Sequence, residues 1–299
     1  MEPSLPCFSQ EDTSLPSILI GAHVSIAGNL LKAVTKAKDI GANCIQIFSS
    51  PPQSWTGPKF SEDTLNEFRA SLEKENISPV FVHALYLINL ASDNSFLRKS
   101  SITALKEDLN FASLIGARGV IFHLGSHPLG WSGSKREELM DSFKRVLEDV
   151  PDNVSLLVEN VAGGGTKLGS TFAQLGEMKN DINDPHLGFC IDTAHTFESG
   201  YDMRTKENVD DMVDLLNQTV GAQNVLAIHC NDSKTDLSSH NDRHENIGEG
   251  KIRIEGFRAL LNHRLMKDKP FILETPGFDS KGPDAKNVEI LKNLISSVN

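Results

Sequence analysis

The chain has 299 residues, enough for one large domain or two ordinary ones. Its hydrophobic content of 39% and charged content of 23% are typical of a globular protein, and its apolar runs are far shorter than the roughly 18 residues that would cross a bilayer. The formal net charge of −11 argues against a protein that holds nucleic acid through bulk positive charge.

The start of the chain and the cysteines indicate where the protein works. Residues 1–17 mix proline, serine and acidic residues without periodicity, and they lack the features of a secretory or mitochondrial targeting segment. We predict a mobile tail here, followed by a single domain over residues 18–299. No cysteine belongs to a C-x-x-C pair, which argues against a thiolate zinc site and for a reduced, intracellular location, the cytoplasm. The cysteines are Cys7, Cys44, Cys190 and Cys230.

Apolar runs rich in Val, Ile, Leu and Phe are predicted to be strands. In chain order they are Ile18–His23, Cys44–Phe48, Pro79–His83, Gly119–His123, Ser155–Asn160, Leu187–Asp192, Val225–Asn231 and Pro270–Thr275. Segments with helical spacing lie between them, for example residues 63–76, where Leu65, Phe68 and Leu72 share one face. Continuous apolar strands that alternate with helices indicate parallel βαβ units.

The number of these units favours a closed barrel. Eight of them in about 280 residues fit an α/β fold of the (β/α)₈ TIM barrel type, with a typical size of about 250 residues. The alternative is a doubly wound open sheet. No G-x-G-x-x-G follows the first strand, so the nucleotide-binding form of that fold has no support.

Six of the predicted strands carry an ionisable residue within the last three positions of their C-terminal end, which a buried strand does not need for packing. These residues are His83, His123, Glu159, Asp192, His229 and Glu274. In a parallel barrel the C-terminal ends of all strands face the same side, where active sites lie, so these side chains are expected to converge. One histidine at a strand end is usually a core residue. Burying six ionisable groups together is costly unless cations pair them.

Two further segments carry candidate ligands. Asp192 and His195 are spaced to bind a metal, or to form a structural hydrogen-bonded pair. Asp242 and His244 lie in a polar loop, and a solvated loop is the simpler interpretation of that segment alone; its Gly248-Glu249-Gly250 run would let backbone approach a ligand closely. Histidine and carboxylate ligands without thiolate suit zinc or manganese, and nine ligands are adequate for two or three ions.

The chain resembles endonuclease IV, the family 2 apurinic/apyrimidinic endonucleases. The motifs that carry the resemblance occur in the family's order from about Ile18 onwards. They are GAHVS, HALYLINL, FHLGSH, VENVAGGGTKLG, GFCIDTAHTFESGYD, HCNDSK, DRHENIGEG and ILETPG. The family's fold is a TIM barrel, in agreement with the strand pattern.

The resemblance implies three zinc ions, with manganese as an alternative at one site. It assigns His83, His123 and Glu159 to one ion. Glu159 also bridges to a second, and His195, Asp242 and His244 hold the third. The second ion is completed by Asp192, His229 and Glu274.

The resemblance also implies an activity: hydrolysis of the phosphodiester bond 5′ to an abasic site in double-stranded DNA during base excision repair. The products are a 3′ hydroxyl and a 5′ deoxyribose phosphate, and blocked 3′ ends are trimmed as well. Zinc lowers the pKa of the attacking water toward about 7. Glu159 and Glu274 are the catalytic carboxylates, and Glu274 also helps to orient this water. The protein is expected to act as a monomer.

Tyr86 and Leu87 match positions that family members insert into bent DNA, since an apolar wedge can unstack and kink a duplex. Ordinary packing beneath a loop is the alternative for Tyr86. Gln53 stands where the family often has a basic inserting residue, so that contact with DNA is in doubt. Two other departures, Ala194 for Cys and Leu124 for Pro, touch no ligand position.

Two other functions are compatible with parts of the pattern. A barrel sugar isomerase or epimerase also places His and carboxylates at strand ends, around one or two metals, and needs no DRH loop. A catalytically weak protein that binds DNA lesions is the second alternative, motivated by Gln53 and the acidic composition.

Overall fold

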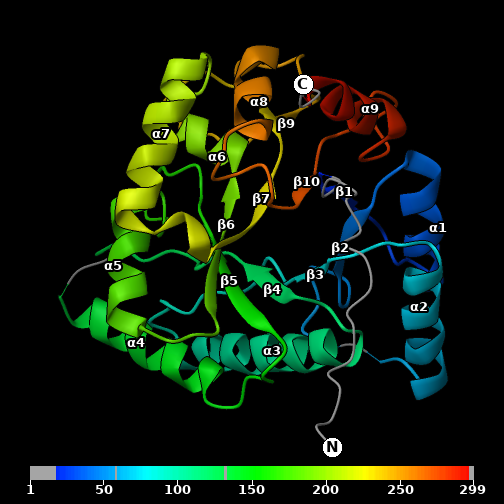
Figure 1. Cartoon of the computed structure of the whole chain (residues 1–299). Coiled ribbons are helices and arrows are strands. Elements are labelled where there is room, and N and C mark those ends of the chain that lie inside the picture. Colours follow the sequence, from blue (N-terminus) through cyan, green and yellow to red (C-terminus); the bar gives the residue numbers. More distant parts are fainter. Residues whose placement is uncertain (1–17, 58, 131–132, 296–299) are drawn as a thin grey trace, which may run out of the picture.

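The computed structural model describes residues 18–57, 59–130 and 133–295. Parallel strands close into a barrel in the order β1-β10-β7-β6-β5-β4-β3-β2, and helices surround it (Figure 1). The barrel strands are β1 Ile20–His23, β2 Cys44–Phe48, β3 Val80–His83, β4 Gly119–Phe122, β5 Ser155–Glu159, β6 Leu187–Asp192, β7 Val225–His229 and β10 Phe271–Leu273. The predicted TIM barrel is confirmed, and an open sheet is excluded. The predicted tail, residues 1–17, lies outside the described residues.

The helices follow the strands in the expected alternation. They are α1 Leu31–Ile40, α2 Glu62–Lys74, α3 Ser95–Leu114, α4 Gly133–Leu147, α5 Phe172–Ile182, α6 Thr193–Glu198, α7 Lys206–Thr219, α8 Arg253–Leu261 and α9 Ala285–Leu294, with the short 3₁₀ turn η1 Ala222–Asn224. Leu65, Phe68 and Leu72 of α2 are buried against the barrel, as their spacing predicted. No helix in the described part of the chain is both long and apolar enough to cross a membrane.

Several strands are shorter than predicted at their C-terminal ends. β4 ends at Phe122 and β10 at Leu273, so His123 and Glu274 each follow a strand instead of closing it. The backbone N–H of Glu274 donates to Asn231 Oδ1 (2.7 Å), a side-chain acceptor. Side-chain acceptors replace strand partners here because the chain is already leaving the sheet at the barrel rim.

One layer of the barrel interior consists of buried apolar side chains. Seven of the eight strands contribute one buried residue each: Cys44, Phe81, Ile121, Leu157, Cys190, Ala227 and Ile272. A larger apolar cluster fills the space between the strands and the helices. Cys44, Cys190 and Cys230 are buried and form no disulfide.

Candidate metal centre

The candidate site is the next layer of the barrel interior. Side chains along a strand alternate between its two faces, so a residue two positions after an interior residue also points inward. Moving two positions along from each residue of the apolar layer gives Gln46, His83, His123, Glu159, Asp192, His229 and Glu274. The six predicted strand-end residues therefore lie directly above the apolar layer, at the C-terminal rim.

The order of the strands places these six residues side by side. β10, β7, β6, β5, β4 and β3 are consecutive neighbours in the barrel, so the ligands form a continuous arc. In the parallel ladders Glu159 is level with Cys190, and Asp192 is level with His229. The prediction that the strand-end side chains converge is confirmed.

A short helix brings a seventh candidate to the arc. The Asp192 side chain accepts a hydrogen bond from His195 N (2.8 Å) and so caps the start of α6. Such caps stabilise a helix start by satisfying its free N–H groups. This six-residue helix carries His195 over the barrel mouth.

The remaining two candidates come from a separate hairpin. Two short strands, β8 Asp232–Ser233 and β9 His244–Glu245, pair antiparallel above the barrel. This pairing directs Asp242 and His244 toward α6: Asp242 Oδ2 lies 3.2 Å from His195 Nε2, and Asp242 Oδ1 lies 3.6 Å from His244 Nε2. The alternative of a freely solvated loop is therefore wrong for these two side chains.

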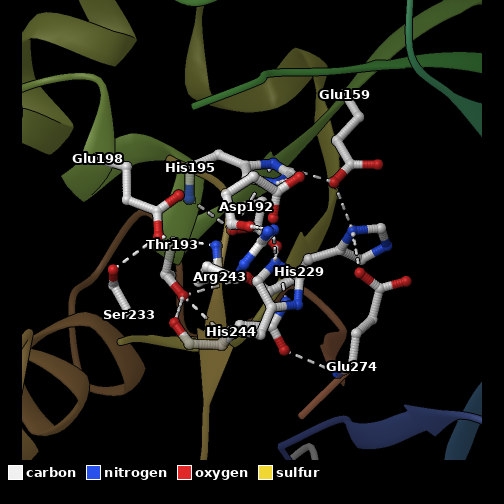
Figure 2. A network of polar contacts seen from close by, with 12 residues as sticks. Glu159, Asp192, Thr193, His195, Glu198, His229, Ser233, Arg243, His244 and Glu274 are labelled. Atoms are coloured by element: carbon white, nitrogen blue, oxygen red, sulfur yellow. Dashed lines mark hydrogen bonds and ion pairs between the residues drawn. The ribbon is translucent and has the colours of Figure 1, made fainter. Parts of the chain in front are cut away.

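Together the side chains form three groups whose ligand atoms lie within 4.8 Å of one another. The first is His83, His123 and Glu159, and the second is Glu159, Asp192, His229 and Glu274. The third is Asp192, His195 and His244, with Asp242 beside the same two imidazoles. Figure 2 shows Glu159 and Glu274 converging on His229, and Asp192, His195 and His244 gathered on the other side of the cluster.

Glu159 occupies the position of a bridge between two groups. Its Oε2 faces His83 Nε2 at 3.3 Å and His123 Nε2 at 3.6 Å. Its Oε1 faces His229 Nδ1 at 2.9 Å. Because each oxygen is directed at a different set of imidazoles, one carboxylate can serve both groups.

Hydrogen bonds to neighbours fix the tautomers of the buried histidines. A backbone carbonyl or a side-chain amide oxygen can only accept, so the ring nitrogen facing it must carry the proton. The three bonds are His83 Nδ1 to Ala84 O (2.7 Å), His195 Nδ1 to Asn160 O (2.9 Å) and His229 Nε2 to Gln46 Oε1 (2.7 Å).

The other nitrogen of each of these rings therefore presents a lone pair to a carboxylate when the ring is neutral. The facing pairs are His83 Nε2 with Glu159, His195 Nε2 with Asp242, and His229 Nδ1 with Glu159. A lone pair and an anionic oxygen repel unless a cation or a proton lies between them. In addition, His195 Nε2 and His244 Nε2 are buried without a hydrogen-bond partner among the described residues. This donor set fits divalent metal ions.

The electrostatics of the cluster favour ionised carboxylates. Burial alone would raise the pKa of Glu159, but the imidazoles of His123, His229 and His195 outweigh it and hold this pKa well below its usual range. Burial would also raise the pKa of Glu274, yet His229 and the hydrogen bond with His23 lower it. Burial lowers the pKa of His123 to about 4, so its imidazole is neutral and able to bind metal near neutral pH.

Comparison with known proteins identifies the family. A family model described as "Xylose isomerase-like TIM barrel" matches residues 34–294. "Probable endonuclease 4" of Halothermothrix orenii is 37% identical over 274 residues, which cover 91% of this chain and 99% of that protein. The chain belongs to the endonuclease IV family. The crystal structure of endonuclease IV from Thermus thermophilus agrees with a TM-score of 0.81 at 34% identity, over 92% of this chain and 98% of that one.

The barrel itself is shared more widely than the family. A D-tagatose 3-epimerase-like protein has a TM-score of 0.68 at 20% identity, over 93% of this chain and 97% of that chain. Such a likeness concerns the fold alone. The membership in the endonuclease IV family therefore rests on the sequence match, and the resemblance found in the motifs is confirmed.

Gln46 is a site residue that the sequence reasoning missed. In this member of the endonuclease IV family it is fully buried at the barrel mouth. Its Nε2 donates to Glu274 Oε1 (2.6 Å) and contacts His23 Nδ1 (2.8 Å), while its Oε1 accepts from His229. A polar residue inside the apolar run CIQIF was the available signal, since it occupies the same inward position as the ligands.

The glycines after the DRH segment have a different role from the one suggested. Asp232 accepts hydrogen bonds from Gly248 N, Gly250 N and Ile252 N at 2.9 to 3.1 Å. A Cβ on Gly250 would lie 2.4 Å from Ser233 O. The glycines therefore let the backbone wrap around the Asp232 carboxylate, and this anchors the hairpin that presents His244.

The candidate DNA-binding residues lie beside the metal groups. Tyr86 is 58% and Leu87 36% exposed, and the Tyr86 ring stands edge-on to His83 at 5.6 Å between centroids. A cavity of about 550 Å³ above the groups is lined by Tyr86, Lys167, Arg243 and several ligands. Gln53 is exposed in the β2–α2 loop and is absent from the described residues that line this cavity.

Proposed function

We propose that this protein is an endonuclease of DNA repair that hydrolyses the phosphodiester bond 5′ to an abasic site. The expected products are a 3′ hydroxyl and a 5′ deoxyribose phosphate, and trimming of blocked 3′ ends is proposed as a second activity. The observation that carries the proposal is the set of three overlapping His and carboxylate groups beneath an open cavity. The relatives named endonuclease 4 support the choice of DNA as the substrate.

We assign the ligands as the family resemblance implies. His83, His123 and Glu159 would hold one zinc ion, and Glu159, Asp192, His229 and Glu274 a second. His195, Asp242 and His244 would hold the third, and manganese remains an alternative at one site. When bound, these ions would lower the pKa of water, neutralise the phosphate and stabilise the leaving oxygen.

The two catalytic glutamates have different surroundings and therefore different proposed roles. Glu159 has a side chain 1% exposed and directs both oxygens at imidazoles, so it holds the metal groups together. Glu274 has a side chain 16% exposed and lines the cavity, so it can also contact the attacking water. His23 and Gln46 hold Glu274 Oε1 and so fix the direction of the carboxylate.

Metal analysis paired with a cleavage assay tests this function. We expect about three divalent ions per chain and incision of an oligonucleotide duplex at a single abasic site. Dialysis against a strong chelator should abolish incision, and added zinc or manganese should restore it, because the imidazoles and carboxylates lose their shared cations.

Two results would redirect the assignment. One or two metals per chain without incision would favour a sugar isomerase or epimerase on the same barrel. Tight binding of abasic duplex without strand scission in the metal-loaded protein would favour a lesion-binding protein.

Tyr86 and Leu87 are the proposed wedge that enters the gap left by the missing base. Extruding a nucleotide that has no base costs less than extruding a paired one, which favours abasic sites as substrates. Tyr86→Ala should weaken binding of abasic duplex about tenfold or more, since stacking of a base on an aromatic ring contributes roughly 1–3 kcal/mol. Fluorescence anisotropy measures this, with metal content as the control. Unchanged affinity and rate would mean that Tyr86 only packs beneath its loop.

Gln53 lies in the β2–α2 loop and is proposed as a weaker, uncharged contact with DNA. The preceding residue, Pro52, accepts a backbone hydrogen bond from Tyr86 N (3.2 Å). A monomer and a cytoplasmic location complete the proposal. The unpaired buried thiols of Cys44, Cys190 and Cys230 are compatible with a reduced compartment.

A further inference from the structure

The loop between β8 and β9 is held by a carboxylate that is not among the proposed metal ligands. Glu198 is the last residue of α6, and its side chain is fully buried. Its Oε1 accepts hydrogen bonds from Ser233 Oγ (2.7 Å), Thr235 Oγ1 (3.1 Å) and Arg243 N (3.2 Å). Figure 2 shows the contact with Ser233 next to His195 and Arg243. Glu198 therefore ties the end of α6 to both ends of this loop.

The bond from the Arg243 backbone has a special place among these contacts. Arg243 stands between Asp242 and His244, two of the ligands proposed for the third ion. The remaining ligand, His195, lies three residues before Glu198 on α6, which is about one helical turn. Helix α6 therefore presents one ligand itself and fixes the backbone between the other two through its last residue.

Backbone carbonyls at the end of α6 reach the same loop. Phe197 O accepts a hydrogen bond from Ser238 N (3.3 Å), and Glu198 O accepts one from His240 N (3.0 Å). The last carbonyls of a helix have no partner within it, so the loop satisfies them. Ser238 and His240 have φ angles of 59° and 54°, an uncommon conformation for residues with a side chain. The path of the loop therefore depends on its contacts with α6.

The buried position of Glu198 is unfavourable for a carboxylate. Burying such a group costs free energy unless hydrogen bonds replace those with water. Burial raises the pKa of Glu198, and the hydrogen bonds from Ser233 and Arg243 oppose this only in part. Its Oε2 is buried without a hydrogen-bond partner among the described residues. Because an apolar side chain would suit this position better for packing, the carboxylate indicates a role in holding the loop.

We propose that Glu198 is a positioning residue for the third ion: the hydrogen bonds that it accepts keep Asp242 and His244 in place. Asp242 Oδ2 lies 3.2 Å from His195 Nε2, so a small shift of the loop would separate the ligands. The β8–β9 pairing and the bonds from Gly248 N and Gly250 N to the Asp232 carboxylate do not involve Glu198. The hairpin should therefore stay folded without Glu198, while the loop gains freedom. The inference rests on the ligand assignment in the proposed function.

Zinc titration of the full-length protein with a competing chromophoric chelator tests this role without DNA. Glu198→Met fills a similar volume but accepts no hydrogen bond, whereas Glu198→Gln keeps an oxygen that can accept. Asp108→Leu is the matched control. Asp108 is also buried, accepts a hydrogen bond from Ser49 Oγ (2.5 Å), and has no partner for Oδ2 among the described residues. Its partner, however, follows β2 and belongs to the β2–α2 loop.

His244→Ala removes a ligand of the third ion and so identifies the zinc-binding class that belongs to it. We expect Glu198→Met to weaken this class about 10–100-fold, the typical effect of removing a group that orients a metal ligand, and to leave the other classes unchanged. Glu198→Gln and Asp108→Leu should bind zinc in this class within about threefold of the wild-type protein. Adding Glu198→Met to His244→Ala should cause no further loss, because the supported site is already absent.

Incision of abasic duplex supplies a second readout. Glu198→Met should need about 10–100-fold more zinc for half-maximal incision, and saturating zinc should restore the rate, since every ligand is still present. Thr235→Val removes one donor to Glu198 at a partly exposed position and should weaken the same class about 3–10-fold. Circular dichroism checks the fold of both variants. If Glu198→Met does not fold, wild-type zinc binding by Thr235→Val would overturn the inference.

Equal weakening of all zinc classes by Glu198→Met, or wild-type affinity in every class, would overturn the inference. A loss in Glu198→Gln as large as in Glu198→Met would overturn it as well, because charge and not hydrogen bonding would then hold the loop. If the third class depends on Glu198 but the wild-type protein does not incise abasic duplex, the inference stands and the proposed function fails. Incision by the wild-type protein, with zinc binding unaffected by Glu198→Met, would support the proposed function and overturn the inference.

Discussion

Glu159→Gln is expected to abolish incision of abasic DNA and to reduce the metal content of the purified protein. Glu159 is buried, its two oxygens face different imidazole sets, and the neighbouring imidazoles hold its pKa well below the usual range. Gln has almost the same volume but lacks the charge that two groups share. Removing one electrostatic contributor to a transition state typically costs about 10²–10³ in rate. We expect the loss here to be at least ~10³-fold, because one residue serves two groups.

The measurement is single-turnover incision of an abasic duplex, together with metal stoichiometry and circular dichroism. Glu137→Gln, an exposed substitution on α4 that removes the same charge, is the control and should leave both values unchanged. Wild-type incision by Glu159→Gln with a full metal complement would exclude the bridging assignment.

Gln46→Met is expected to lower incision and zinc affinity by about 10–100-fold, the typical effect of removing a group that orients a metal ligand. The amide of Gln46 fixes the His229 tautomer through a bond to Nε2 and holds Glu274 Oε1. Met fills a similar volume but can make neither bond. The ring of His229 and the carboxylate of Glu274 would lose their fixed directions, and the second group should release its metal first.

Zinc titration with a competing chromophoric chelator resolves this loss, because only the sites near Gln46 should weaken. The matched control is Ile47→Val, the next residue of β2, whose side chain packs in the outer cluster toward the helices. It should lower the free energy of unfolding by roughly 1 kcal/mol and leave metal binding unchanged. Equal zinc affinity in Gln46→Met and the wild-type protein would mean that Gln46 only fills space.

Most of the fold could be predicted because each apolar run lies close to a strand of the barrel. The errors lie at the strand ends; β1 begins two residues later than predicted, and at Glu274 and Asn231 side chains replace strand partners as hydrogen-bond acceptors. Which side chain accepts such a hydrogen bond depends on residues far apart in the chain, so a local sequence pattern cannot predict where the strand ends. The burial of Leu65, Phe68 and Leu72, by contrast, follows from their spacing alone.

Some residues of the candidate site could likewise be predicted from the sequence, and others could not. His83, Glu159 and His229 could be found from the sequence because each closes an apolar strand. The Gln46 side chain points inward by the same alternation, but a neutral amide is not a typical metal ligand. Its role is visible only from the imidazole of His229 and the carboxylate of Glu274 that it contacts. The start of α6 after Asp192 was not predicted, since the hydrogen bond that the Asp192 side chain accepts from His195 N depends on the conformation of both residues.

The sequence by itself indicated the barrel and the set of candidate ligands, because parallel strands bring their C-terminal ends to the same rim, and its motifs indicated the family. The family resemblance implied a grouping of the ligands, but only the tertiary structure brought Asp192 into the group of His195 and His244 as well, since such contacts depend on the order of the strands around the closed barrel. It also decided the tautomers of His83, His195 and His229, because each is set by an acceptor that folding places beside the ring.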